Sequence, residues 1–86
     1  MEFRLILSTI ALFSGSFLLV GQSAADYYSF GKKQQEQGRV AEAIAFYTEC
    51  LNLEPENTQA LYNQGIAYFT DSQFENAATN FEIVID

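Results

Sequence analysis

The chain has 86 residues, of which 49% are hydrophobic, and its four Lys and Arg residues stand against 11 Asp and Glu residues, giving a formal net charge of −7. This length allows one small domain and a segment that leads into it. The acidic balance disfavours binding to nucleic acid and to anionic membrane surfaces, because both require clustered Lys and Arg.

Residues 1–25 have the features of an export signal. Arg4 precedes an apolar run over residues 5–20, and the small residues up to Ala25 suit cleavage by a signal peptidase after that residue. The alternative is a retained membrane anchor over residues 5–20, which is disfavoured because a spanning helix needs about 20 apolar residues. We therefore expect an exported protein, periplasmic or secreted, that contacts a membrane only through an uncleaved N-terminal segment.

Two helices are predicted next. The first runs from about Asp26 to Gln37 and ends at Gly38, which can adopt the positive φ that terminates a helix. The second spans residues 40–53 and carries apolar side chains at spacings of three and four. Its predicted buried stripe consists of Val40, Ala43, Ile44, Tyr47, Cys50 and Leu51.

Two further helices are predicted after Pro55, which ends the second. Asn57 or Thr58 supplies the N-cap of the third helix. Asp71 and Ser72 form the following turn, and Ser72 with Glu75 has the spacing of a capping box for the fourth helix. The core-facing side of that helix is predicted to contain Phe74, Ala77, Ala78, Phe81 and either Val84 or Ile85.

The two helix pairs repeat one pattern. The interval from Gly31 to Gly65 also separates Ala43 from Ala77 and Tyr47 from Phe81, and it maps Tyr28 onto Tyr62 and Tyr27 onto Leu61. We call this interval the repeat interval. A fixed interval of this length is typical of a helical array in which each pair buries its apolar face against the next.

The repeated residues resemble the tetratricopeptide repeat family, whose pattern is W-x2-L-G-x2-Y, then A-x3-F, then P. Gln34 stands where the family has Tyr, and Gln64 stands where it has Leu, so each pair lacks one packing residue. The first pair otherwise matches at Tyr27, Phe30, Gly31, Ala43, Tyr47 and Pro55, and the second at Leu61, Gly65, Tyr68, Ala77 and Phe81.

The resemblance implies an all-α fold of tandem antiparallel helix-turn-helix repeats, an α-solenoid preceded by an N-terminal hydrophobic signal helix. Repeat 1 covers residues 26–57 and repeat 2 covers residues 58–86. The small residues at the glycine and alanine positions let the helices approach closely, and the rings of Tyr27, Tyr47 and Phe81 are expected to fill the space between the pairs.

An array of this kind usually needs about three repeats to be stable. The last helix carries no stop signal. We therefore expect repeat 2 to be truncated at its C-terminus, as in a fragment of a longer protein, or its open end to dock on something, self-association included.

Members of this family typically bind an extended peptide or a partner helix in a concave groove lined by the first helix of each pair. Tyr28 and Tyr62 matter most here, because the same residue type recurs at the same phase; the alternative interpretation is that they pack between helices. By analogy the groove would be lined by Tyr28, Lys32, Gln35, Tyr62, Asn63, Ile66 and Phe69.

A carboxylate clamp, which some relatives build from Lys and Asn, is not supported. Asn63 matches one clamp Asn, but Tyr28 replaces the first clamp Lys and Lys32 replaces its accompanying Asn. Lys32 is then either a solvated surface side chain or a contact for an acidic or C-terminal group of a partner.

The sequence contains few residues suited to catalysis. There is no His, the single Cys50 lies on an apolar stripe where it would pack as a small hydrophobe, and acidic residues such as Glu42, Glu49 and Glu56 have the spacing of solvated helix faces. We therefore expect no enzyme activity, cofactor or metal. The predicted function is a protein-binding scaffold, such as an envelope assembly factor, and the rival hypothesis is the non-catalytic N-terminal repeat region of a larger envelope enzyme such as a peptidase or cell-wall hydrolase.

Overall fold

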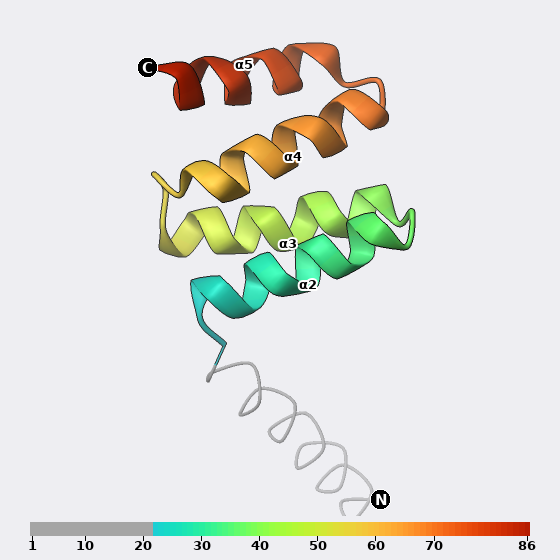
Figure 1. Ribbon diagram of the computed structural model, residues 1–86, viewed down its shortest axis with the longest axis vertical. Coiled ribbons are helices and arrows are strands. Elements are labelled where there is room, and N and C mark those ends of the chain that lie inside the picture. Colours follow the sequence, from blue (N-terminus) through green and yellow to red (C-terminus); the bar gives the residue numbers. More distant parts are fainter. Residues whose placement is uncertain (1–21) are drawn as a thin grey trace, which may run out of the picture.

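The computed structural model describes residues 22–86, so the predicted signal segment lies outside the described residues over positions 1–21. All regular secondary structure of residues 22–86 is helical. The helices are α2 (Ala24–Glu36), α3 (Val40–Leu53), α4 (Thr58–Thr70) and α5 (Phe74–Ile85). Each helix packs against the next along the chain, as Figure 1 shows, and α2 also contacts α4. The prediction of four helices packed in pairs is confirmed.

Helix α2 begins two residues earlier than predicted, because its cap lies upstream of Asp26. The Ser23 hydroxyl accepts a hydrogen bond from the Asp26 backbone N–H (3.2 Å), and the Asp26 carboxylate accepts one from the Ser23 backbone N–H (3.0 Å). This reciprocal pair is a capping box. Ala24 is buried against Cys50 and Ala60. A cut after Ala25 would therefore remove both the cap of α2 and one core side chain.

The two turns within the pairs repeat the same backbone geometry. Gly38 has φ 77°, and Ser72, which lies one repeat interval later, has φ 63°. In each turn the next backbone N–H closes the helix end, from Arg39 to the Gln34 carbonyl and from Gln73 to the Tyr68 carbonyl, both at 2.8 Å. The predicted role of Gly38 as a helix terminator is confirmed.

The predicted capping box of Ser72 and Glu75 is wrong. The N-cap of α5 is Gln73, with φ −92° and ψ 71°, and no side chain caps this helix end. Ser72 would have to be the residue directly before the first helical one, but the turn needs it in the left-handed conformation instead, and the helix begins only at Phe74. The predicted Asn57 cap of α4 is confirmed, since its side chain accepts from the Ala60 backbone N–H (2.9 Å).

A ring lies over a glycine inside each helix pair. A Cβ added to Gly31 would come within 2.6 Å of a ring carbon of Tyr47, and a Cβ added to Gly65 would come within 2.5 Å of a ring carbon of Phe81. Ala43 and Ala77, one turn before these rings, are also buried. The rings of Tyr47 and Phe81 were expected to fill the space between the pairs, and the structure adds that each ring also packs against the first helix of its own pair.

We predict that Gly65→Ala destabilises the protein. At an ordinary helix position Ala is more favourable than Gly by about 1 kcal/mol, but here the new methyl overlaps the Phe81 ring, and overpacking costs about 1–3 kcal/mol. Urea unfolding measures the sign. Adding Phe81→Leu should restore part of the loss, whereas Gln59→Ala on the exposed side of α4 should have little effect; a stabilising Gly65→Ala would contradict the ring-on-glycine contact.

Ser72→Gly is expected to stabilise the protein, in contrast to Gly65→Ala. The left-handed conformation costs a non-glycine residue about 1–2 kcal/mol, and the added backbone entropy of Gly offsets about 0.5–1 kcal/mol of that, so the variant should gain about 0.5–1 kcal/mol. The matched control is Ser29→Gly in the exposed middle of α2, which should lose stability. Thermal unfolding of both variants checks this, and a loss in both would contradict the strain at Ser72.

Candidate functional site

The seven residues predicted to contact a partner lie on α2 and α4, which contact each other directly. We call this set the inner face. Three of its members interact with one another across the two helices, whereas the others are exposed or half-buried. Its members are Tyr28, Lys32 and Gln35 on α2, and Tyr62, Asn63, Ile66 and Phe69 on α4.

Tyr28, Gln35 and Asn63 join the two helix pairs. The Asn63 side-chain amide donates to the Tyr28 hydroxyl (2.7 Å), and the Gln35 side-chain amide donates to the Asn63 backbone carbonyl (3.4 Å). The Tyr47 hydroxyl donates to the Gln35 side-chain oxygen (2.6 Å), and the rings of Tyr28 and Tyr47 lie 5.9 Å apart. For Tyr28 the structure thus shows a packing and bonding role between helices.

The Tyr47 phenol at this junction stays protonated over a wide pH range. Burial raises the pKa of Tyr47 well above its ordinary value, and the nearby Tyr28 and Glu36 act in the same direction. A protonated phenol keeps its donor, so the bond to Gln35 persists, and this bond fixes the Gln35 amide with its N–H group turned toward α4.

Tyr62 and Phe69 form the exposed part of the inner face. Tyr62 is 52% exposed and Phe69 is 60% exposed, with the half-buried Ile66 between them on α4. Each ring contacts a second ring from α5. The ring centroids of Tyr62 and Phe81 lie 5.9 Å apart, and those of Phe69 and Phe74 lie 5.1 Å apart. Each side chain therefore has a neighbouring ring on α5 while about half of its surface is open to solvent.

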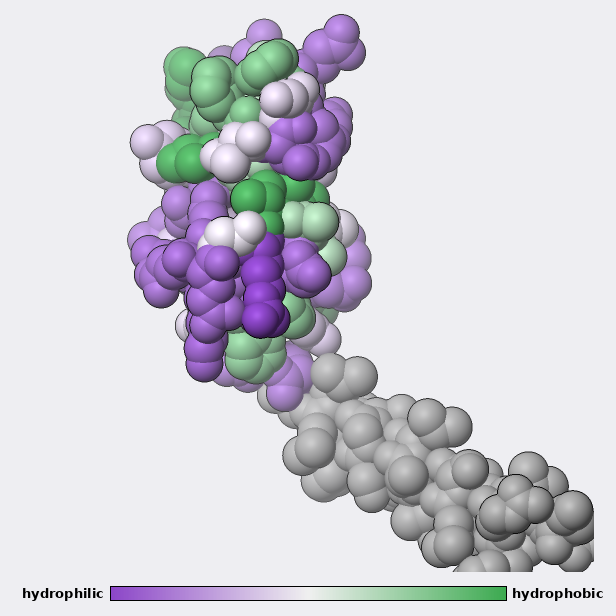
Figure 2. Space-filling model, turned by 90° about the vertical axis from the view of Figure 1, so that its right-hand side faces the viewer, coloured by the Kyte–Doolittle hydropathy of each residue, from purple (hydrophilic) through white to green (hydrophobic). Residues whose placement is uncertain are grey.

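The distribution of surface character differs between the two helix pairs. Figure 2 looks at the side that carries the α2–α3 and α4–α5 turns, and it shows hydrophobic side chains gathered over the α4–α5 part, whereas hydrophilic side chains cover most of the α2–α3 part. Phe74, beside the α4–α5 turn, is itself 56% exposed. The second pair therefore offers most of the apolar surface of this side.

A buried amide network between the pairs was not expected from the sequence, where Gln64 stood only for a lost packing residue. Gln64 is buried, and its side-chain N–H group donates to the Thr48 hydroxyl (2.9 Å) and to the Ile44 carbonyl (3.2 Å). Asn80 in turn donates to the Gln64 side-chain oxygen (2.8 Å) and to the Leu61 carbonyl (3.1 Å). We call Thr48, Gln64 and Asn80 the amide network; the signal for it was a polar residue on each of two otherwise apolar helix faces.

Cys50 lies where the sequence predicted it, in the core. It has no exposed surface and packs against Ala24 and Ala60. Burial raises the pKa of the Cys50 thiol, with Glu54 acting in the same direction, so the thiolate that would act as a nucleophile or ligand is disfavoured. Among residues 22–86 there is no group of three or more His, Cys, Asp or Glu side chains placed to hold a metal ion.

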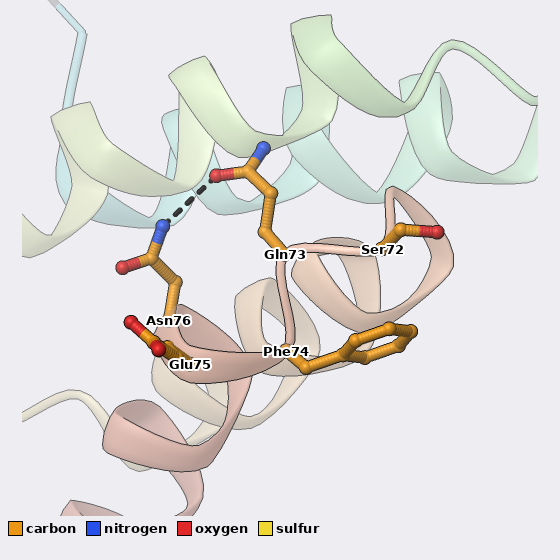
Figure 3. Close-up of a pocket in the computed structure, with 5 residues that line it drawn as sticks. All are labelled: Ser72, Gln73, Phe74, Glu75 and Asn76. Atoms are coloured by element: carbon orange, nitrogen blue, oxygen red, sulfur yellow. Dashed lines mark hydrogen bonds between the residues drawn. The ribbon is translucent and has the colours of Figure 1, made fainter.

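A shallow hollow at the start of α5 is formed by five consecutive residues, 72–76. Figure 3 shows that Asn76 donates to the Gln73 side-chain oxygen (2.9 Å), whereas Phe74 points away from both. Gln73 also donates to the Asp71 carboxylate (2.7 Å). These bonds hold the turn itself, and no residue of the inner face lines this hollow.

Comparisons with known proteins add no family: no family model matches the sequence, and no curated protein matches it. The four helices of residues 22–86 are each too short or too polar to cross a membrane.

We predict a specific energetic signature for the amide network. Asn80→Leu leaves the buried Gln64 oxygen without its donor, which should cost about 1–3 kcal/mol. Gln64→Leu should cost less, about 1 kcal/mol, because Asn80 keeps the Leu61 carbonyl and Thr48 keeps the Ile44 carbonyl. A double-mutant cycle by urea unfolding should show that the double variant costs less than the sum; additive costs would mean that the two amides are not coupled.

Proposed function

We propose that this chain is an exported protein-interaction module of the tetratricopeptide type, which binds a peptide or a partner helix on its inner face and acts as a scaffold or assembly factor. The family pattern in the sequence supports the type of repeat. The equal turn geometry at Gly38 and Ser72, and the ring over a glycine in each pair, support two copies of one helix-pair unit. An α-solenoid built from such units has a concave side on which a polypeptide can lie.

One observation carries the binding function: the aromatic side chains on α4 are exposed and yet held in place. Tyr62 and Phe69 keep about half of their surface open while each rests on a ring of α5. Large rigid aromatic side chains contribute much of the energy at protein interfaces. Because these two are already restricted, little side-chain freedom is lost when a partner binds.

The rest of the proposed binding surface consists of Lys32 and of the three residues that join α2 to α4. Lys32 is exposed on α2 and offers a cation to an acidic or C-terminal group of a partner. Tyr28, Gln35 and Asn63 hold α2 and α4 together, so in this proposal they shape the surface rather than supply its main contacts. The export part of the proposal rests on the sequence of residues 1–25 alone.

The proposal is tested by capture of partners from the native envelope with the full-length protein and with the double variant Tyr62→Ala/Phe69→Ala. Both side chains are half exposed, so the variant should fold, which circular dichroism checks. Loss of an aromatic anchor costs about 2 kcal/mol or more in binding, so retention of the partners should fall by more than about tenfold.

The control variant is Leu53→Ala, which removes an exposed apolar side chain from the end of α3, outside the inner face. It should retain the same partners as the unchanged protein. If the double variant retains them equally well, the inner face is not the binding surface and the proposed function is wrong.

A further inference from the structure

An apolar hollow lies between the N-terminal part of α4 and the C-terminal part of α5. Tyr62 on α4 and Phe81, Val84 and Ile85 on α5 line it. Its volume is about 450 Å³, and Ile85 at its edge is 81% exposed. We call these four residues the end hollow. It differs from the turn hollow of Figure 3, which consecutive residues form around their own hydrogen bonds.

The end hollow has a filled counterpart in the first helix pair. Moving back by one repeat interval relates its four residues to Tyr28, Tyr47, Cys50 and Leu51. There Ala60 of α4 packs into the cluster around Cys50, with Tyr28 and Leu51 against it. Asn63 of α4, three residues later, donates to the Tyr28 hydroxyl.

Burial shows what the covering helix contributes. Tyr47 and Cys50 have no exposed surface, whereas their counterparts Phe81 and Val84 are only half-buried. The two pairs are otherwise equivalent in sequence position and in the ring-on-glycine contact. The difference in burial therefore has one cause: α4 covers the first pair, whereas no helix of residues 22–86 covers the second pair in the same way.

We propose that the end hollow binds an amphipathic helix of a partner protein, laid on α4 and α5 as α4 is laid on α2 and α3. This inference rests on the proposed protein-binding function and names the kind of partner. The bound helix would place a small side chain in the hollow, where Ala60 lies in the first pair. It would place an amide three residues later, where Asn63 meets Tyr28, so that this amide donates to the Tyr62 hydroxyl.

Charge specifies a further position of the partner helix. In the first pair Gln64, four residues after Ala60, donates to the Thr48 hydroxyl. The counterpart of Thr48 is Glu82, an exposed carboxylate on α5. Two more carboxylates, Glu56 and Asp86, line the adjoining hollow that shares Val84 with the end hollow. A Lys or Arg in the place of Gln64 would therefore meet Glu82. Residues 40–86 contain no Lys or Arg, so none of their side chains neutralises these carboxylates.

A second copy of the chain fits this place poorly. The helix that would continue the same packing is α2 of the second copy, which carries Asp26 where α4 carries Ala60. Asp26 belongs to the capping box of α2, and burying its carboxylate in an apolar hollow is costly. A partner helix with a small side chain followed by a basic one avoids that cost.

The test uses the full-length protein and a defined probe, a peptide with the sequence of residues 57–71 held helical by a lactam on its outward side. The probe carries Gln64→Lys to face Glu82, together with Tyr62→Gln and Phe69→Gln to remove its outward rings. Fluorescence anisotropy should show saturable binding of one peptide per chain. A probe with Gln64→Glu in place of Gln64→Lys should bind at least about tenfold more weakly, because like charges across an interface are strongly unfavourable.

Changes in the protein complete the test. Glu82→Lys should reverse the preference between the two probes, and Ile85→Asp should weaken binding of the lysine probe by at least about tenfold. The matched control is Phe74→Asp, which places the same charge on another exposed apolar position of α5, outside the end hollow, and should leave binding unchanged. Both Ile85 and Phe74 are exposed, so these variants should fold.

Three results would overturn the inference: no saturable binding of the lysine probe, equal binding by the Ile85→Asp variant, or no change of preference in Glu82→Lys. Sedimentation showing a concentration-dependent dimer that Ile85→Asp abolishes would assign the end hollow to a second copy and would likewise overturn it. If the probe fails while partner capture still depends on Tyr62 and Phe69, only this inference is lost. If the probe binds as expected while capture is indifferent to those two residues, the inner-face function is lost instead.

Discussion

The close approach of a ring to a glycine inside each helix pair is the contact on which the rest of the structure depends. Tyr47 lies over Gly31 and Phe81 lies over Gly65, at distances that leave no room for a Cβ. Because this contact sets the spacing and phase of the two helices in a pair, it also decides which side chains are left to face the neighbouring pair. Everything that joins the pairs, and everything left open at the end, follows from that phase.

The junction between the pairs combines apolar packing with amide hydrogen bonds. Ala24, Cys50 and Ala60 supply the apolar part, while Gln64 and Asn80 bond across α3, α4 and α5. Buried amides are favourable only when their donors and acceptors are satisfied, and the bonding directions restrict how the helices can sit. A junction of this kind fixes the relation of the two pairs more narrowly than apolar contact alone, and it holds the exposed rings of α4 in a defined place.

Much of the helical organisation was predictable from local sequence. The bounds of α3, the Asn57 cap and the left-handed Gly38 agree with expectation, since each depends on a few neighbouring residues. The start of α2 and the cap of α5 were predicted wrongly. In the first case Asp26 was expected to begin the helix, whereas it is the partner of the Ser23 cap. In the second, Ser72 had the right spacing, but it is the left-handed residue of the turn. The sequence assigned the seven inner-face residues to the first helix of each pair, but it did not indicate which of them bond to one another.

The sequence by itself determined the repeating unit, because small and aromatic side chains that return at one fixed interval specify helix pairs and their phase. Only the tertiary structure decided the fate of equivalent residues. Tyr28 and Tyr62 have the same type and phase, yet Tyr28 bonds to Asn63 while Tyr62 is half exposed beside an unfilled hollow. The physical reason is that burial depends on whether another helix lies alongside, and a pattern repeated along the chain carries no information on which copy is covered.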